Sequence, residues 1–81
     1  MAEILYEYFK KEVEEGKILV RINPDNYSGL ELIVHEKGQL KKTKRDFDET
    51  IYEELEFDEF KKSSPLEFNL HLKGVSNLSS T

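Results

Sequence analysis

The chain has 81 residues, no cysteine and a formal net charge of −5. This length is typical of one domain with a thin core, and the lack of cysteine excludes disulfides and thiolate metal sites. The acidic balance argues against general nucleic-acid or anionic-membrane binding. No run approaches the ~20 apolar residues of a membrane span, and the N-terminus has acids where a secretory signal has bases. We therefore expect a soluble, cytoplasmic protein.

Residues 2–15 have the pattern of an amphipathic helix. Apolar side chains recur at helical spacing, charged side chains fill the other face, and Gly16 follows as a good helix end. The predicted apolar stripe consists of Ile4, Leu5, Tyr8, Phe9 and Val13.

Residues 17–37 predict a β-hairpin, because two aliphatic runs flank a segment of turn-forming residues. The favoured register closes the loop over residues 24–28 and pairs Val20 with Leu32, which places Arg21 opposite Glu31. One face then collects six aliphatic residues under the first helix, and a slip of one residue would break that face. These residues are Ile18, Val20, Ile22, Leu30, Leu32 and Val34.

The next segments predict an edge strand and an acidic helix. Lys37–Gly38 suits a tight reversal, and a strand over about residues 39–47 has little apolar character but many lysines, as exposed sheet edges often have. Residues 48–56 predict an acidic helix with an apolar stripe through Ile51 and Leu55, and Asp48 is the expected N-cap.

Residues 64–74 have two conflicting patterns. Ser64, Pro65 and Glu67 resemble a helix capping box, with Gly74 as a possible terminator. Four large apolar residues nevertheless alternate with polar ones between residues 66 and 72, which is the pattern of a half-buried strand. We favour the strand, because burying four large side chains outweighs a cap worth ~1 kcal/mol.

These elements predict an α+β domain of residues 1–74, followed by a flexible serine-rich tail of residues 75–81. The expected architecture is a small antiparallel sheet with the helices 2–15 and 48–56 packed on one face. The opposite face would then be open, with Leu19 and Ile33 as an apolar spot inside a polar rim.

The sequence has no motif that predicts catalysis. The two histidines, His35 and His71, lack the spacing of metal ligands, and the acids after Asp46 lack the glycine and alternation of a calcium loop. No nucleophile motif or glycine-rich phosphate loop occurs. We expect no catalytic residue, no metal, no cofactor and no enzymatic activity.

Charge segregation is the most pronounced remaining feature, because a basic segment is followed at once by an acidic one. We expect a non-enzymatic domain that binds a protein partner, or a second copy of itself, through the open sheet face or the basic edge strand. The candidate contact residues are Arg21, Ile33, His35, Lys42 and Lys44. The alternative is binding of a nucleic acid or another anionic ligand through the basic strand, and its candidates are Lys41, Lys42, Lys44 and Arg45.

Overall fold

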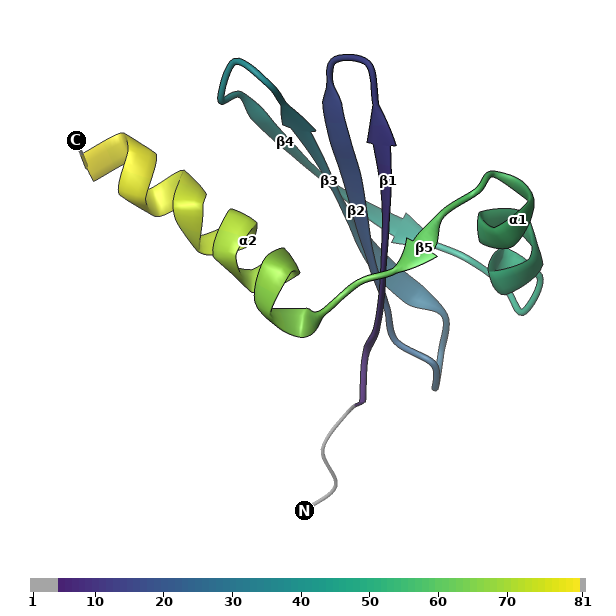
Figure 1. Ribbon diagram of the computed structural model, residues 1–81. Helices are drawn as coiled ribbons and strands as arrows, with labels where there is room; N and C mark the ends of the chain where they lie inside the picture. Colours follow the sequence, from purple (N-terminus) through teal and green to yellow (C-terminus); the bar gives the residue numbers. More distant parts are fainter. Residues whose placement is uncertain (1–4, 81) are drawn as a thin grey trace.

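The computed structural model describes the backbone of residues 5–80 and the side chains of residues 5–73. Four strands follow one another as an antiparallel meander: β1 (Glu7–Val13), β2 (Gly16–Ile22), β3 (Ser28–His35) and β4 (Leu40–Asp46). The helix α1 (Ile51–Phe57), the two-residue strand β5 (Lys61–Lys62) and the helix α2 (Pro65–Ser80) complete the chain. The strand order is β4-β3-β2-β1-β5, so β4 forms one edge of the sheet (Figure 1). The predicted α+β class is therefore confirmed.

The predicted helix over residues 2–15 is wrong, because residues 7–13 form the strand β1 and residues 1–4 lie outside the described part. Tyr8 and Phe9 explain the difference. They are neighbours in sequence, so a strand points them to opposite sides of the sheet. Phe9 is buried against α1, and Tyr8 packs on the ring of Phe68 in α2. In a helix the two neighbouring rings would both point towards one side, so they could not reach cores on opposite faces.

The predicted hairpin and its reversal are confirmed, but the register is shifted by one residue. Val20 pairs with Glu31 rather than Leu32, and Leu19 pairs with Leu32. The shift places Gly29 opposite Ile22, and the ring of Phe47 lies directly over the space that a side chain at Gly29 would fill. The glycine thus makes room for an aromatic ring beside the buried Ile22.

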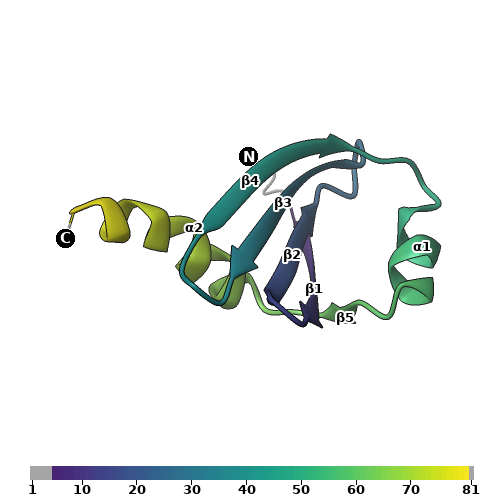
Figure 2. The same cartoon turned by 90° about the horizontal axis from the view of Figure 1, so that it is seen from above.

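This register divides the apolar residues between two cores on opposite faces of the sheet. Phe9, Val20 and Ile22 pack against Ile51 and Leu55 of α1 on one face. Leu19 and Leu32 pack against Phe68 of α2 on the other. The predicted arrangement, with the helices 2–15 and 48–56 on one face, is therefore wrong, and the two observed helices lie on opposite faces. Figure 2 shows α1 and α2 at opposite ends of the sheet. Each helix buries a short apolar stripe against its own face of the sheet.

The predicted turn at Lys37–Gly38 and the edge strand that follows it are both observed. Gly38 has a φ of 92°, a conformation that favours glycine, and its N–H donates to the carbonyl of His35 at 2.9 Å. β4 then pairs with β3 only, and most of its side chains are exposed.

The acidic helix is also observed, with its N-cap at Thr50 instead of Asp48. The Asp48 carboxylate accepts from the Thr50 N–H at 2.9 Å and contacts the Thr50 hydroxyl, so it orders the residues just before the helix. At the other end, the Phe60 N–H donates to the Leu55 carbonyl at 2.8 Å and the Glu59 N–H to the Glu56 carbonyl at 3.0 Å. These two bonds form a Schellman motif, which turns Phe60 back onto the core around Leu55.

The predicted strand over residues 66–72 is wrong, because the segment is part of α2. Ser64 is the cap, and its hydroxyl accepts from the Glu67 N–H at 3.1 Å. Phe68 and Leu72, one helical turn apart, pack on the sheet, whereas Leu66 and Leu70 stay 68% and 60% exposed. Because the alternating segment forms a helix, two of its four large apolar side chains lie in solvent.

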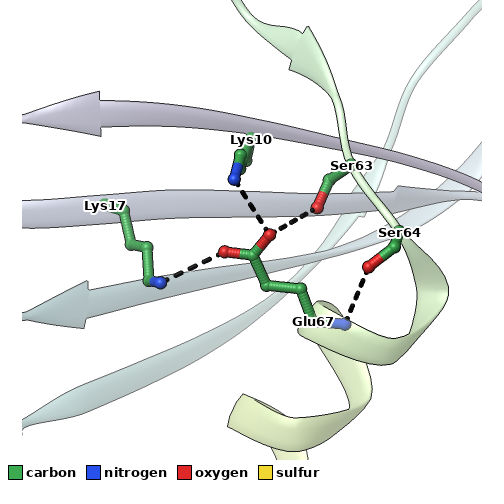
Figure 3. Close-up of polar contacts among 5 residues, drawn as sticks. All are labelled: Lys10, Lys17, Ser63, Ser64 and Glu67. Carbon is green, nitrogen blue, oxygen red and sulfur yellow. Dashed lines mark hydrogen bonds and ion pairs between the residues drawn. The ribbon is translucent and has the colours of Figure 1, made fainter.

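The Glu67 carboxylate joins α2 to the sheet (Figure 3). Its Oε1 accepts from Lys10 Nζ at 3.0 Å and from the Ser63 hydroxyl at 3.1 Å, and its Oε2 accepts from Lys17 Nζ at 3.2 Å. Glu67 is the position at which a capping box would return its carboxylate to the cap residue. Here the carboxylate binds two strands instead, so it fixes the start of α2 on β1 and β2.

The backbone of α2 continues through Ser80, so it includes most of the segment expected to be a tail. Residue 81 lies outside the described residues. The division into a domain of residues 1–74 and a tail of residues 75–81 stays a prediction.

Candidate functional site

A hollow of about 390 Å³ lies on the α2 face of the sheet, over β2, β3 and β4 near the start of β1. We call it the basic hollow, because three cations on this face border it: Arg21, Lys42 and Lys44. The other lining residues are Tyr6, Ser28, Gly29, Leu30, Arg45 and Asp46.

Strand register brings these cations together. Arg21 on β2 pairs with Leu30 on β3, and Leu30 pairs with Lys44 on β4, so the three form one row across the sheet. Lys42 lies two residues before Lys44 and therefore points to the same face. Leu30 forms an apolar floor between the arginine and the lysines, because it packs on the core around Leu32.

Aromatic rings hold the guanidinium of Arg21 in place. Its Cζ lies 4.5 Å from the centre of the Tyr6 ring and 5.4 Å from the centre of the Phe68 ring. Contacts of this kind favour a cation over an aromatic face and restrict the side chain. A guanidinium held this way keeps its N–H donors for a planar anion such as a carboxylate.

The charges of the basic hollow are mostly uncompensated by the residues that the structure describes. Within residues 5–73, Arg21, Lys42 and Lys44 make no ion pair. Both lysines are exposed, and Asp46 is the one carboxylate among the lining residues. The geometry thus presents three cations, an aromatic ring and an apolar floor to an incoming anion.

Of the remaining predicted contact residues, Arg45 also lines the basic hollow, whereas Ile33, His35 and Lys41 do not. Ile33 and His35 on β3 and Lys41 and Arg45 on β4 belong to the α1 face by strand parity. Arg45 Nη1 lies 3.5 Å from Glu31 Oε1 and is half exposed. The expected set is therefore split: Arg21, Lys42 and Lys44 come together, whereas Ile33 and His35 do not join them. The expected apolar spot of Leu19 and Ile33 does not exist, because Leu19 is buried under α2.

The histidines lie on different elements, His35 on β3 and His71 on α2. Burial lowers the pKa of His71, and the nearby charge of Lys17 lowers it further. No group of three side chains that could hold a metal ion occurs within the described residues.

Tyr6, Ser28 and Leu30 line the basic hollow, but the sequence patterns did not mark them as candidate contact residues. Tyr6 was assigned to a helix, and Leu30 was expected on the face with Val20. A signal for the site was nevertheless present in the sequence. Arg21, Lys42 and Lys44 fall on one face when the hairpin register is shifted by one residue.

Comparison with protein-family models, with curated proteins and with solved structures found no match to this chain. Over residues 5–80, no helix is both long and apolar enough to cross a membrane.

Proposed function

We propose that this protein is a non-enzymatic binding domain whose basic hollow takes the carboxylates of an acidic segment in a partner protein. The observation that carries the proposal is the convergence of Arg21, Lys42 and Lys44 on one hollow without ion-pair partners among the described residues. Cations left unpaired beside an apolar floor favour an anionic partner that also has some apolar surface.

Carboxylates fit this site better than a nucleic-acid backbone. A nucleic-acid surface usually extends over many phosphates, and single-stranded nucleic acids use aromatic platforms for stacking. Here Asp46 borders the cations, the face of Tyr6 is already occupied by Arg21, and the whole chain carries a net charge of −5. These features favour the carboxylates of a short acidic segment over a long nucleic-acid polyanion.

The test is the affinity for a fluorescein-labelled peptide with a central run of mixed glutamate and aspartate, measured by fluorescence anisotropy. We expect binding that weakens as NaCl is added, because exposed charges are screened. The double variant Lys42→Glu/Lys44→Glu should bind about tenfold more weakly or worse, since each lost ion pair is worth about 0.5–1 kcal/mol and reversal adds repulsion.

The matched control is Lys37→Glu/Lys61→Glu, which makes the same change of net charge at two exposed residues outside the basic hollow and outside β4. It should bind nearly as well as the wild type. A peptide with glutamine and asparagine in place of the acids should not bind. Equal losses in both double variants would contradict the proposal, because the attraction would then be general. Tighter binding of a single-stranded oligonucleotide than of the acidic peptide would favour the nucleic-acid alternative.

A further inference from the structure

The outer edge of β4 adjoins the basic hollow and is unpaired in the described residues. β4 is the terminal strand of the sheet and pairs only with β3. The opposite edge is the two-residue strand β5. A strand at a sheet edge leaves alternate backbone N–H and C=O groups directed outward, and these can pair with another strand.

The basic hollow accounts for only part of the charge on this strand. Lys42 and Lys44 border the basic hollow, but Lys41 and Arg45 project from the other face of β4, and all four are exposed. Arg45 is already paired with Glu31, so Lys41 is the cation on that face without an ion pair among the described residues.

From this arrangement we infer that the acidic segment binds in extended conformation, as an added strand along the outer edge of β4. The inference rests on the proposed function and specifies how the partner binds. Successive side chains of an added strand alternate between the two faces of the sheet. A run of consecutive acids would therefore meet Lys42 and Lys44 on one face and Lys41 and Arg45 on the other. Cross-strand neighbours of opposite charge lie about 5 Å apart and attract.

The same charges exclude other strands from this edge. Lysines along an edge oppose pairing with apolar or basic strands. A second copy of β4 would place like charges opposite each other, which is destabilising. An acidic strand is the class of partner whose side chains these residues attract while their backbone groups pair, as in other cases of strand addition to a sheet edge.

Hydrogen exchange of β4 amides, followed by NMR on the full chain, tests the inference. The probe is the acidic peptide at saturation, and citrate is the control, because it carries carboxylates without a peptide backbone. We expect alternate amides of β4 to exchange about tenfold more slowly or slower still with the peptide, because newly paired N–H groups become protected. Citrate should leave their exchange unchanged, and so should the peptide for the amides of α1.

The outcomes separate the two proposals. Peptide binding that depends on Lys42 and Lys44 but leaves β4 exchange unchanged would overturn the added strand and keep the proposed function. Equal slowing by citrate would also overturn the added strand, since protection would then follow charge neutralisation. Absence of peptide binding would overturn both.

Discussion

Glu67 Oε1 on α2 lies 3.0 Å from Lys10 Nζ on β1, and this ion pair ties the last helix to the sheet. Hydrogen bonds from Lys10, Lys17 and Ser63 together lower the pKa of Glu67 to about 2 against the opposing effect of burial, and the bond from Lys10 contributes most. The carboxylate is therefore held ionised by the folded state. Its contribution to stability should depend strongly on pH.

We predict an acid-sensitive loss of stability that depends on Glu67. Because its pKa is lower in the folded chain than in the unfolded one, the contribution is fully present above about pH 4.5 and is lost as the pH falls towards 2. A quarter of the side chain is exposed, so we expect the loss to be about 2 kcal/mol. Urea unfolding between pH 7 and pH 3 measures it. In Glu67→Gln the dependence should be flatter, whereas Glu14→Gln, in an exposed turn, should follow the wild type.

His71 should add to this loss at higher pH. Burial lowers its pKa, with Lys17 contributing, so the folded chain favours the neutral imidazole. The stability linked to His71 is present above its ordinary pKa of 6.5 and is lost as the pH falls through the lowered value. His71→Gln should reduce the slope of stability against pH below pH 7 in the same urea experiments. An unchanged slope would contradict this assignment.

Phe68 should be the main apolar anchor of α2. Its side chain is 1% exposed and packs on Tyr8 and the buried leucines of the sheet. Phe68→Ala should destabilise the fold by about 3–5 kcal/mol, because it leaves a cavity under the helix. Leu70→Ala on the same helix removes a 60% exposed side chain and should change stability by less than about 0.5 kcal/mol. Equal effects in chemical denaturation would show that α2 is not held through this face.

Glu59 occupies a left-handed conformation that suits glycine. Its φ is 67°, and it lies directly after the C-cap of α1 in the Schellman motif. Glu59→Gly should stabilise the protein by about 1 kcal/mol, because it removes the strain of a side chain at positive φ. The control is Asp58→Gly, where φ is −83° and glycine offers no such relief. Thermal unfolding of both variants distinguishes the conformational effect from the loss of an acidic charge.

Gly29 should not accept a larger residue. A Cβ there would clash with Phe47 Cε2 and lie 2.9 Å from the backbone oxygen of Arg21. Gly29→Ala should therefore cost about 1–3 kcal/mol through overpacking. Gly38→Asn is the control, because nothing lies within 4 Å of a Cβ at Gly38 and asparagine tolerates its positive φ. Similar stability of the two variants would contradict the close packing of Phe47 on Gly29.

Several elements could be predicted from the sequence because their signals are local. The turn formers before Gly29 predict the reversal between β2 and β3, the lysines of β4 predict an edge, and the stripe through Ile51 and Leu55 predicts α1. The convergence of Lys42 and Lys44 with Arg21 was only partly predicted. All three were named as candidates, but they were grouped with Ile33 and His35, which lie on the other face.

The sequence by itself determined that the chain reverses between β2 and β3, that β4 is an exposed basic edge and that an acidic helix follows it. Only the tertiary structure decided the register of the hairpin and the secondary structure of residues 7–13 and 65–72. Both strands of the hairpin have aliphatic residues on each face, so the register depends on what covers each face: Phe47 over Gly29, α1 over Val20 and Phe68 over Leu19. Those contacts join residues far apart in the chain, and burial against them outweighs the local pattern.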